Sequence, residues 1–152
     1  MNTDIKLMIT LAGKQRLPHL EADIFADSEV ACFYLRTLCK DEEWHFSTRE
    51  TPYELARNTY FCAKHIINGR WLEAERIIAS HGRWACLYAN NIVNGRFYLA
   101  EQLIASNPRD ALWYAKYIIG GRWPNGEAAI DSDIRCQKEY GIFLDTVAER
   151  NQ

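Results

Sequence analysis

An arginine and a glutamate recur together five positions apart in this chain of 152 residues. A guanidinium binds a carboxylate or a phosphate through two parallel hydrogen bonds, so these residues have two possible uses. Each glutamate either pairs with an arginine beside a helix start and fixes a turn, or the arginines form a ridge that binds phosphates or an acidic partner. We favour the structural use, because a free anion-binding ridge would not need a glutamate beside every arginine. The pairs are Arg70/Glu75, Arg96/Glu101 and Arg122/Glu127.

Large aromatic residues are the second group of candidates. Trp71, Phe97 and Trp123 directly follow the three arginines, and a shared repeat position predicts packing between repeats. Other tryptophans fall outside that register, and an exposed aromatic on a rigid surface is a good interface anchor. The expected partner contacts are Trp44, Trp84, Tyr98 and Trp113, together with the acidic run Asp41, Glu42 and Glu43.

A metal site and a catalytic site are both expected to be absent. Cys62 and His65 have a spacing that could place two zinc ligands on one helix face, but no second ligand pair of this kind follows. We therefore expect Cys62 to be a core thiol, like Cys32 and Cys86, which share a repeat position. No motif brings a nucleophile, a base and an orienting group together, so neither an enzyme nor a cofactor is expected. An enzyme of unknown class remains as a second alternative.

The element that must position these residues is a repeat. Gly69, Gly95 and Gly121 each precede one of the three arginines and are 26 residues apart, and a fixed period of this size is typical of stacked arrays. Arg16 and Glu21 match the first pair at an offset of 54. Unit ends then follow at intervals of 28, 28, 26 and 26 residues, so the array is expected to occupy the whole chain.

Each unit is predicted to be a pair of short helices. Asn107 and Pro108 are good residues for a helix start, and a helix from Thr51 toward Asn68 begins in the same way. Gly95 and the pair Gly120-Gly121 are expected to end the first helix of a hairpin in the left-handed conformation. Second helices are expected near 72–80 and 98–106.

The sequence therefore predicts an all-α fold. We expect an α-solenoid-like stack of about five helical hairpins of 26–28 residues, closed by a C-terminal capping helix. The chain is expected to form a single domain, 1–152. Degenerate repeats occupy 1–48, clear repeats occupy 49–130, and the capping helix occupies 131–150.

Charge is distributed unevenly along the chain. Residues 1–48 carry a net charge of −3, residues 49–126 carry +4 and residues 127–152 carry −3. A pI near 6.1 lacks the basic character usual for nucleic-acid binders, so a protein partner of mixed charge is favoured. The chain lacks an apolar run of 18 residues, which argues against a membrane span. Five cysteines, an odd number, favour a reducing compartment and a cytoplasmic location.

The segment from Tyr114 to Glu127 resembles a tandem helical repeat with the pattern Gly-Arg-Trp-x-x-Ala-Glu, carried by many uncharacterised small bacteriophage and bacterial proteins. The resemblance covers 57–130 clearly. It implies a phage-encoded accessory protein in the host cytoplasm that binds and modulates or inhibits a host or defence protein complex. We therefore expect a non-enzymatic protein-binding module of unknown oligomeric state, and the alternative is a nucleic-acid-binding protein that uses the basic central repeats.

Overall fold

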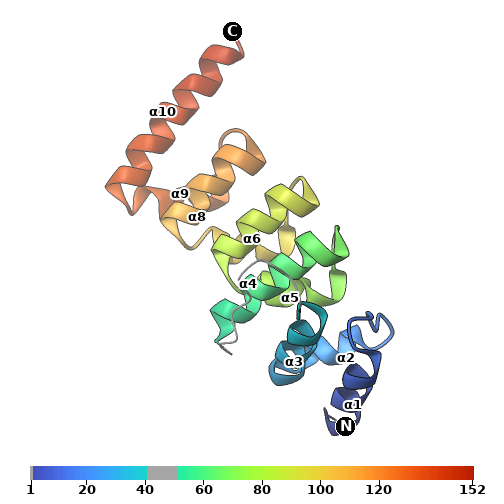
Figure 1. Ribbon diagram of the computed structural model, residues 1–152. Coiled ribbons are helices and arrows are strands. Elements are labelled where there is room, and N and C mark those ends of the chain that lie inside the picture. Colours follow the sequence, from blue (N-terminus) through green and yellow to red (C-terminus); the bar gives the residue numbers. More distant parts are fainter. Residues whose placement is uncertain (1, 41–50) are drawn as a thin grey trace. The chain divides into compact units, whose positions relative to one another are not determined.

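The computed structural model describes residues 2–40 and 51–152, and every regular element in these ranges is a helix (Figure 1). The predicted all-α class is confirmed for this part of the chain. The chain divides into two compact units, Met1–Ile78 and Ala79–Gln152. The prediction of a single domain over 1–152 stays a prediction.

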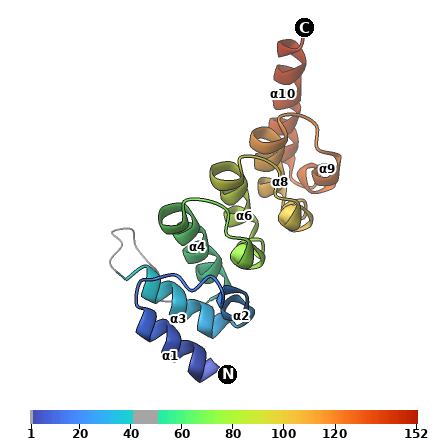
Figure 2. The same cartoon turned by 90° about the vertical axis from the view of Figure 1, so that its right-hand side faces the viewer.

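The first unit contains five α-helices in its described residues. Helix α3 contacts both α1 and α4, and α2 packs against α3, as Figure 2 shows. The side chains of Ile9, Ile24 and Leu35 are fully buried between these helices. The helices are α1 (Asn2–Ala12), α2 (Glu21–Ala26), α3 (Ser28–Leu38), α4 (Pro52–Cys62) and α5 (Glu75–Ile78).

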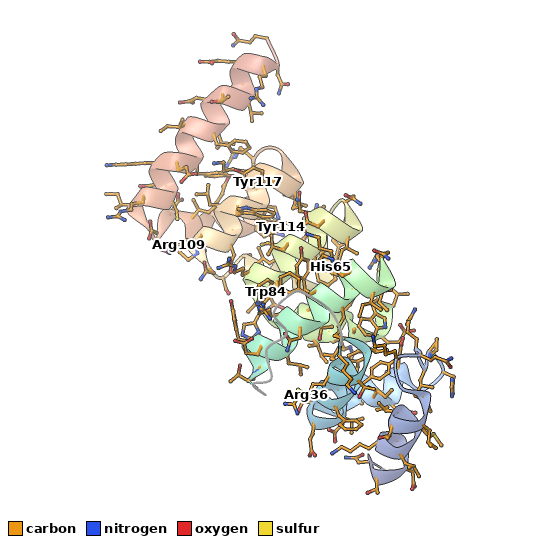
Figure 3. All side chains as sticks on the ribbon, viewed as in Figure 1. Arg36, His65, Trp84, Arg109, Tyr114 and Tyr117 are labelled. Atoms are coloured by element: carbon orange, nitrogen blue, oxygen red, sulfur yellow. A yellow bond between two sulfur atoms is a disulfide. The ribbon has the colours of Figure 1, made fainter. Side chains whose placement is uncertain are left out.

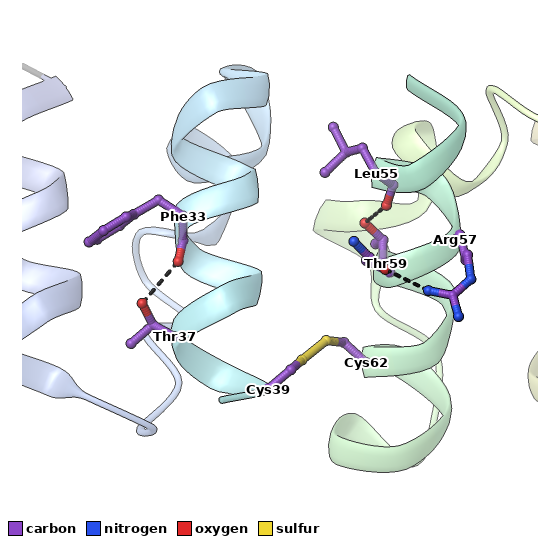
Figure 4. Close-up of a disulfide and its surroundings, with 8 residues drawn as sticks. Phe33, Thr37, Cys39, Leu55, Arg57, Thr59 and Cys62 are labelled. Atoms are coloured by element: carbon purple, nitrogen blue, oxygen red, sulfur yellow. Dashed lines mark hydrogen bonds between the residues drawn. A yellow bond between two sulfur atoms is a disulfide. The ribbon is translucent and has the colours of Figure 1, made fainter. Parts of the chain in front are cut away.

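A disulfide joins the ends of two neighbouring helices in this unit. Cys39 lies at the end of α3 and Cys62 at the end of α4, and their Cα atoms are 6.9 Å apart (Figure 4). The expectation that Cys62 is a core thiol is therefore wrong, although the residue is fully buried. Spacing in the sequence could not reveal this pair, because it forms only when α3 packs beside α4. Cys32, Cys86 and Cys136 are buried thiols.

The second unit is organised around α8, which contacts four other helices. Tyr114 on α8 and Ile130 on α9 are fully buried, and Tyr140 on α10 is almost fully buried. The predicted closing helix is present as α10. The helices are α6 (Gly82–Tyr88), α7 (Glu101–Ile104), α8 (Pro108–Tyr114), α9 (Pro124–Asp131) and α10 (Ile134–Arg150).

The helix starts form where the sequence predicts them. The side chain of Asn107 accepts hydrogen bonds from the backbone N–H groups of Arg109 and Asp110, and Pro108 is the first residue of α8. Thr51 accepts from the N–H of Glu54 at the start of α4. These side chains satisfy donors that have no partner within the helix, which is why such residues favour helix starts.

The helix ends differ from the prediction. Helices α4, α6 and α8 each continue into a π-helical turn, at Ala63–Ile67, Ala89–Val93 and Ala115–Ile119. The residue that follows adopts the left-handed conformation: φ is 55° at Asn94 and 75° at Gly120. Gly95 and Gly121 lie one position later, have no positive φ, and a Cβ added to either would meet no atom within 4 Å. The role predicted for Gly95 is therefore wrong, because Asn94 already adopts that conformation, whereas Gly120 of the predicted pair Gly120-Gly121 ends its helix in this way.

The second helices begin with a 3-10 turn that continues into one α-helical turn. Leu72–Ala74 precedes α5, and Tyr98–Ala100 precedes α7. Glu75 and Glu101 are the first residues of α5 and α7, so the repeated glutamates sit at a helix start as expected. In the described part of the chain, none of the helices has the length and apolar character needed to span a bilayer.

Candidate functional site

The repeated arginines bind the repeated glutamates. Arg96 donates from Nε and Nη2 to the two carboxylate oxygens of Glu101, both at 2.7 Å. Arg70 and Glu75, and Arg122 and Glu127, form the same bidentate pair at 2.8–2.9 Å. The predicted pairing of each glutamate with its own arginine is confirmed. Arg16 and Glu21 form a fourth pair, as their alignment with the clear repeats suggested.

A tyrosine completes three of these pairs. The hydroxyl of Tyr114 donates to Glu101 and accepts from the backbone N–H of Phe97, both at 2.8 Å. Tyr34 and Tyr140 make the equivalent bonds. Each hydroxyl donates to the glutamate 13 residues earlier and accepts from the backbone N–H of the residue 17 positions earlier. Since Tyr114 belongs to α8 and Glu101 to α7, the hydroxyl joins one helix to the next. We call each arginine, glutamate and tyrosine set a clamp.

The clamps keep their carboxylates ionised. The hydrogen bonds from Arg96 lower the pKa of Glu101, and those from Arg122 lower the pKa of Glu127. Burial raises the pKa of Glu21, but bonds from Arg16, Trp71 and Tyr34 together outweigh it, so the pKa is lowered. A carboxylate with a lowered pKa in the folded state stabilises the fold above the pH at which the unfolded group titrates. That stability is lost as the pH falls through the folded pKa, so acid should weaken the clamps.

Replacing Tyr114 with phenylalanine tests one clamp. The variant keeps the buried ring but leaves the N–H of Phe97 without an acceptor, so unfolding free energy should fall by about 1–3 kcal/mol. The same change at Tyr98, which is 70% exposed, is the matched control and should stay within about 0.5 kcal/mol of wild type. Urea unfolding followed by circular dichroism measures both, and equal stability of the two variants would contradict the clamp.

The aromatic residues that follow the arginines belong to the core. Trp71, Phe97 and Trp123 are only 1–3% exposed, so the predicted packing role is confirmed. The Nε1–H of Trp71 also donates to Glu21 at 2.7 Å, which adds an indole to the first clamp. None of these three rings is accessible to a partner.

The predicted contact residues have different outcomes. Trp84, which is labelled in Figure 3, is buried, so its assignment as a contact is wrong. The same position of the 26-residue period is buried at Asn58 and Cys136 and half-buried at Asp110. Tyr98 is largely exposed and lies beneath the guanidinium of Arg96 at 4.7 Å. The remaining members of the acidic and aromatic set, Trp44, Asp41, Glu42 and Glu43, lie outside the described residues.

Trp113 occupies the most accessible position of the tryptophans that the structure describes. It is half-buried on α8, and its ring centroid is 4.9 Å from that of Tyr117, which is 58% exposed. Two open grooves meet at Trp113. One, of about 300 Å³, lies between α6 and α8, and the other, of about 330 Å³, lies between α8 and α10. We call this surface of α6, α8 and α10 the Trp113 face.

Three arginines on this face were missed by the sequence reasoning. Arg83, Arg109 and Arg135 lie 26 residues apart, near the starts of α6, α8 and α10, and all are exposed. The signal was present in the period itself. The clamp arginines recur with the same period in a different register.

No grouping of three or more metal-binding side chains occurs among residues 2–40 and 51–152. His65 instead stacks on the ring of Phe61, with centroids 6.0 Å apart. Burial raises the pKa of the Cys86 thiol, which disfavours the reactive thiolate.

Comparison with known proteins adds no relative. No protein-family model, curated protein or solved structure matches the chain. The resemblance to tandem Gly-Arg-Trp repeats therefore stays a prediction.

Proposed function

We propose that this chain is a non-enzymatic protein-binding module and that the Trp113 face is its contact surface. The observation that carries the proposal is the half-buried Trp113 ring beside exposed Tyr117, with an open groove on either side. Tryptophan and tyrosine in such positions are typical binding hot spots, because a partner buries a large area at low entropic cost.

The use of the other repeated side chains supports this choice. The clamp arginines and glutamates already form hydrogen bonds with one another, and Trp71, Phe97 and Trp123 are buried. These residues are therefore poor candidates for contacts with a partner. Trp113 and Tyr117 have no equivalent role in the core. A second exposed group, Tyr98 with Leu99 and Leu103, lies on the other helices of this unit and is a secondary candidate.

The stacking of the repeats is a second part of the proposal. We propose about five helical hairpins of 26–28 residues stacked as an α-solenoid and closed by the capping helix. The recurrence of the clamp, the π-helical turn and the 3-10 start within the units supports this arrangement. By the resemblance, the partner would be a host or defence complex bound by a phage-encoded protein.

A capture experiment tests the proposal. The full chain is immobilised, incubated with bacterial lysate with and without nuclease, and the bound proteins are quantified by mass spectrometry. Trp113→Ala should reduce capture of a specific protein at least tenfold, corresponding to a hot spot of about 2 kcal/mol or more. The control is Ile142→Ala, an equally apolar truncation at a 68% exposed site outside both grooves, which should leave capture unchanged.

Two results would overturn the proposal. One is equal capture by wild type and Trp113→Ala, and the other is loss of all bound protein after nuclease treatment. The second result would instead favour a nucleic-acid binder.

A further inference from the structure

The Trp113 face carries a row of arginines that form no ion pair within the described residues, although the guanidinium of Arg83 lies over the ring of Trp84 at 5.6 Å. Arg83, Arg109 and Arg135 occupy the same place in successive helices, two residues after the N-caps His81, Asn107 and Asp133. Within residues 2–40 and 51–152, none of the three has a carboxylate within ion-pair distance. The clamp arginines, by contrast, each bind a glutamate through two hydrogen bonds.

The row runs along both grooves. Figure 3 labels Arg109. Arg83 and Arg109 line the groove between α6 and α8, and Arg109 and Arg135 line the groove between α8 and α10. Arg109 therefore lies at the centre of the row, and Trp113, one helical turn further along α8, lines both grooves with it. A ligand that follows the row must pass beside the tryptophan.

Helix packing sets the spacing of the row. Helix α8 packs against α6 and against α10, and packed helices are about 8–10 Å apart. An extended segment in the polyproline II conformation has three residues per turn and advances about 3.1 Å per residue, so every third side chain lies on the same face, about 9 Å further along. Carboxylates at every third position of an extended segment would therefore meet successive arginines.

Other charges on the face narrow the choice of ligand. Asp110, Asp133 and Glu139 also line the grooves. Asp133 caps α10, and Glu139 binds Lys116 at 2.7 Å. Burial raises the pKa of Asp110, while nearby Arg83 partly opposes the shift. Over the whole unit, 79–152, eight lysines and arginines are matched by eight acidic residues.

We propose that the Trp113 face binds an extended acidic segment of a protein, with carboxylates on Arg83, Arg109 and Arg135 and an apolar side chain against Trp113. This inference rests on the proposed function and names the chemistry of its partner. A continuous polyphosphate chain carries a charge on every nucleotide and would meet the groove carboxylates as well as the arginines. A peptide can place its charges only where the arginines lie, so the observations favour the peptide.

Fluorescence anisotropy with defined probes tests the proposal. The probe is a labelled twelve-residue Gly/Ser peptide with glutamate at every third position and one central leucine. A second peptide has glutamine in place of glutamate, and a labelled single-stranded oligothymidylate of twelve nucleotides represents nucleic acid. We expect wild type to bind the glutamate peptide at least tenfold more tightly than either other probe.

Three variants test whether the glutamate peptide binds at the row formed by Arg83, Arg109 and Arg135. Arg109→Gln should weaken glutamate-peptide binding by about tenfold or more, because a charge-assisted hydrogen-bonded contact is lost. Arg150→Gln removes a charge from an exposed residue at the end of α10 and should have no effect. Asp110→Asn should strengthen binding several-fold, since it removes a carboxylate from one groove without changing the side-chain shape.

The outcomes separate this inference from the proposed function. Failure of the glutamate peptide to bind, or binding that Arg109→Gln leaves unchanged, overturns the acidic-segment proposal. Tighter binding of oligothymidylate overturns it in favour of nucleic acid. If the peptide fails while Trp113-dependent protein capture persists, the proposed function stands and only the partner's acidic character is refuted.

Discussion

Replacing Trp71 with alanine is expected to lower the unfolding free energy by about 3–5 kcal/mol, the usual cost of removing a buried tryptophan. The ring is only 1% exposed and meets Phe25 edge-on, with centroids 4.7 Å apart. Its Nε1–H also binds the fully buried carboxylate of Glu21. The substitution therefore creates a cavity and removes one hydrogen bond from a buried charge at the same time. Urea unfolding of the full chain measures the change.

Two further variants give this prediction its controls. Trp71→Phe keeps most of the ring, as Phe97 does at the equivalent position, and should cost only about 1–3 kcal/mol through the lost hydrogen bond. Trp113→Ala removes the same side chain from a half-buried site and should cost clearly less than Trp71→Ala. If Trp113→Ala proved as destabilising as Trp71→Ala, Trp113 would belong to the core and could not be the proposed contact.

Loss of the disulfide is expected to have the second-largest effect on stability. Cys39 and Cys62 are 23 positions apart, and a cross-link over a loop of this length stabilises a fold by about 3 kcal/mol in the chain-entropy treatment. The double variant Cys39→Ala/Cys62→Ala should lose about this much, and reduced wild type should match it. The control is Cys136→Ala, which removes a buried thiol outside the disulfide. Reducing agent should lower its unfolding free energy by the same amount as that of wild type.

The number of free thiols shows whether the Cys39–Cys62 disulfide forms, independently of its effect on stability. Oxidised protein unfolded without reducing agent should expose three reactive thiols to alkylation, as the three buried thiols predict. Five alkylated cysteines in protein purified under oxidising conditions would show that the Cys39–Cys62 bond does not form.

The sequence predicted the parts of the fold that depend on short separations. Arg96 and Glu101 are five positions apart and pair around one helix start, so their spacing was enough to infer the contact. Asn107 caps the helix that directly follows it. The third member of a clamp is 13 residues from its glutamate and lies on another helix. The period placed Tyr114 and Tyr140 in one register, but their hydroxyl bonds depend on how two helices pack.

The errors have a common physical origin. Gly95 was given the left-handed position because glycine adopts it most easily, yet Asn94 occupies that conformation. Trp84 was expected to be exposed because it breaks the aromatic register, but the face of a residue depends on its helix position and not on its type. The Cys39–Cys62 bond required knowledge of which helix ends are neighbours. Each error concerned orientation or packing, which spacing alone does not determine.

In the proposed account, the clamps stabilise the fold and the Trp113 face binds the partner. The measurement that tests it most directly compares Arg96→Ala with Trp113→Ala, recording unfolding free energy and partner capture per folded molecule for both. Arg96→Ala should lower the unfolding free energy, because Glu101 loses two hydrogen bonds, and should keep its capture. Trp113→Ala should lose capture at least tenfold while losing less stability than a core tryptophan variant. The opposite pattern, with binding lost at Arg96 and retained at Trp113, would show that the clamp arginines are the binding site.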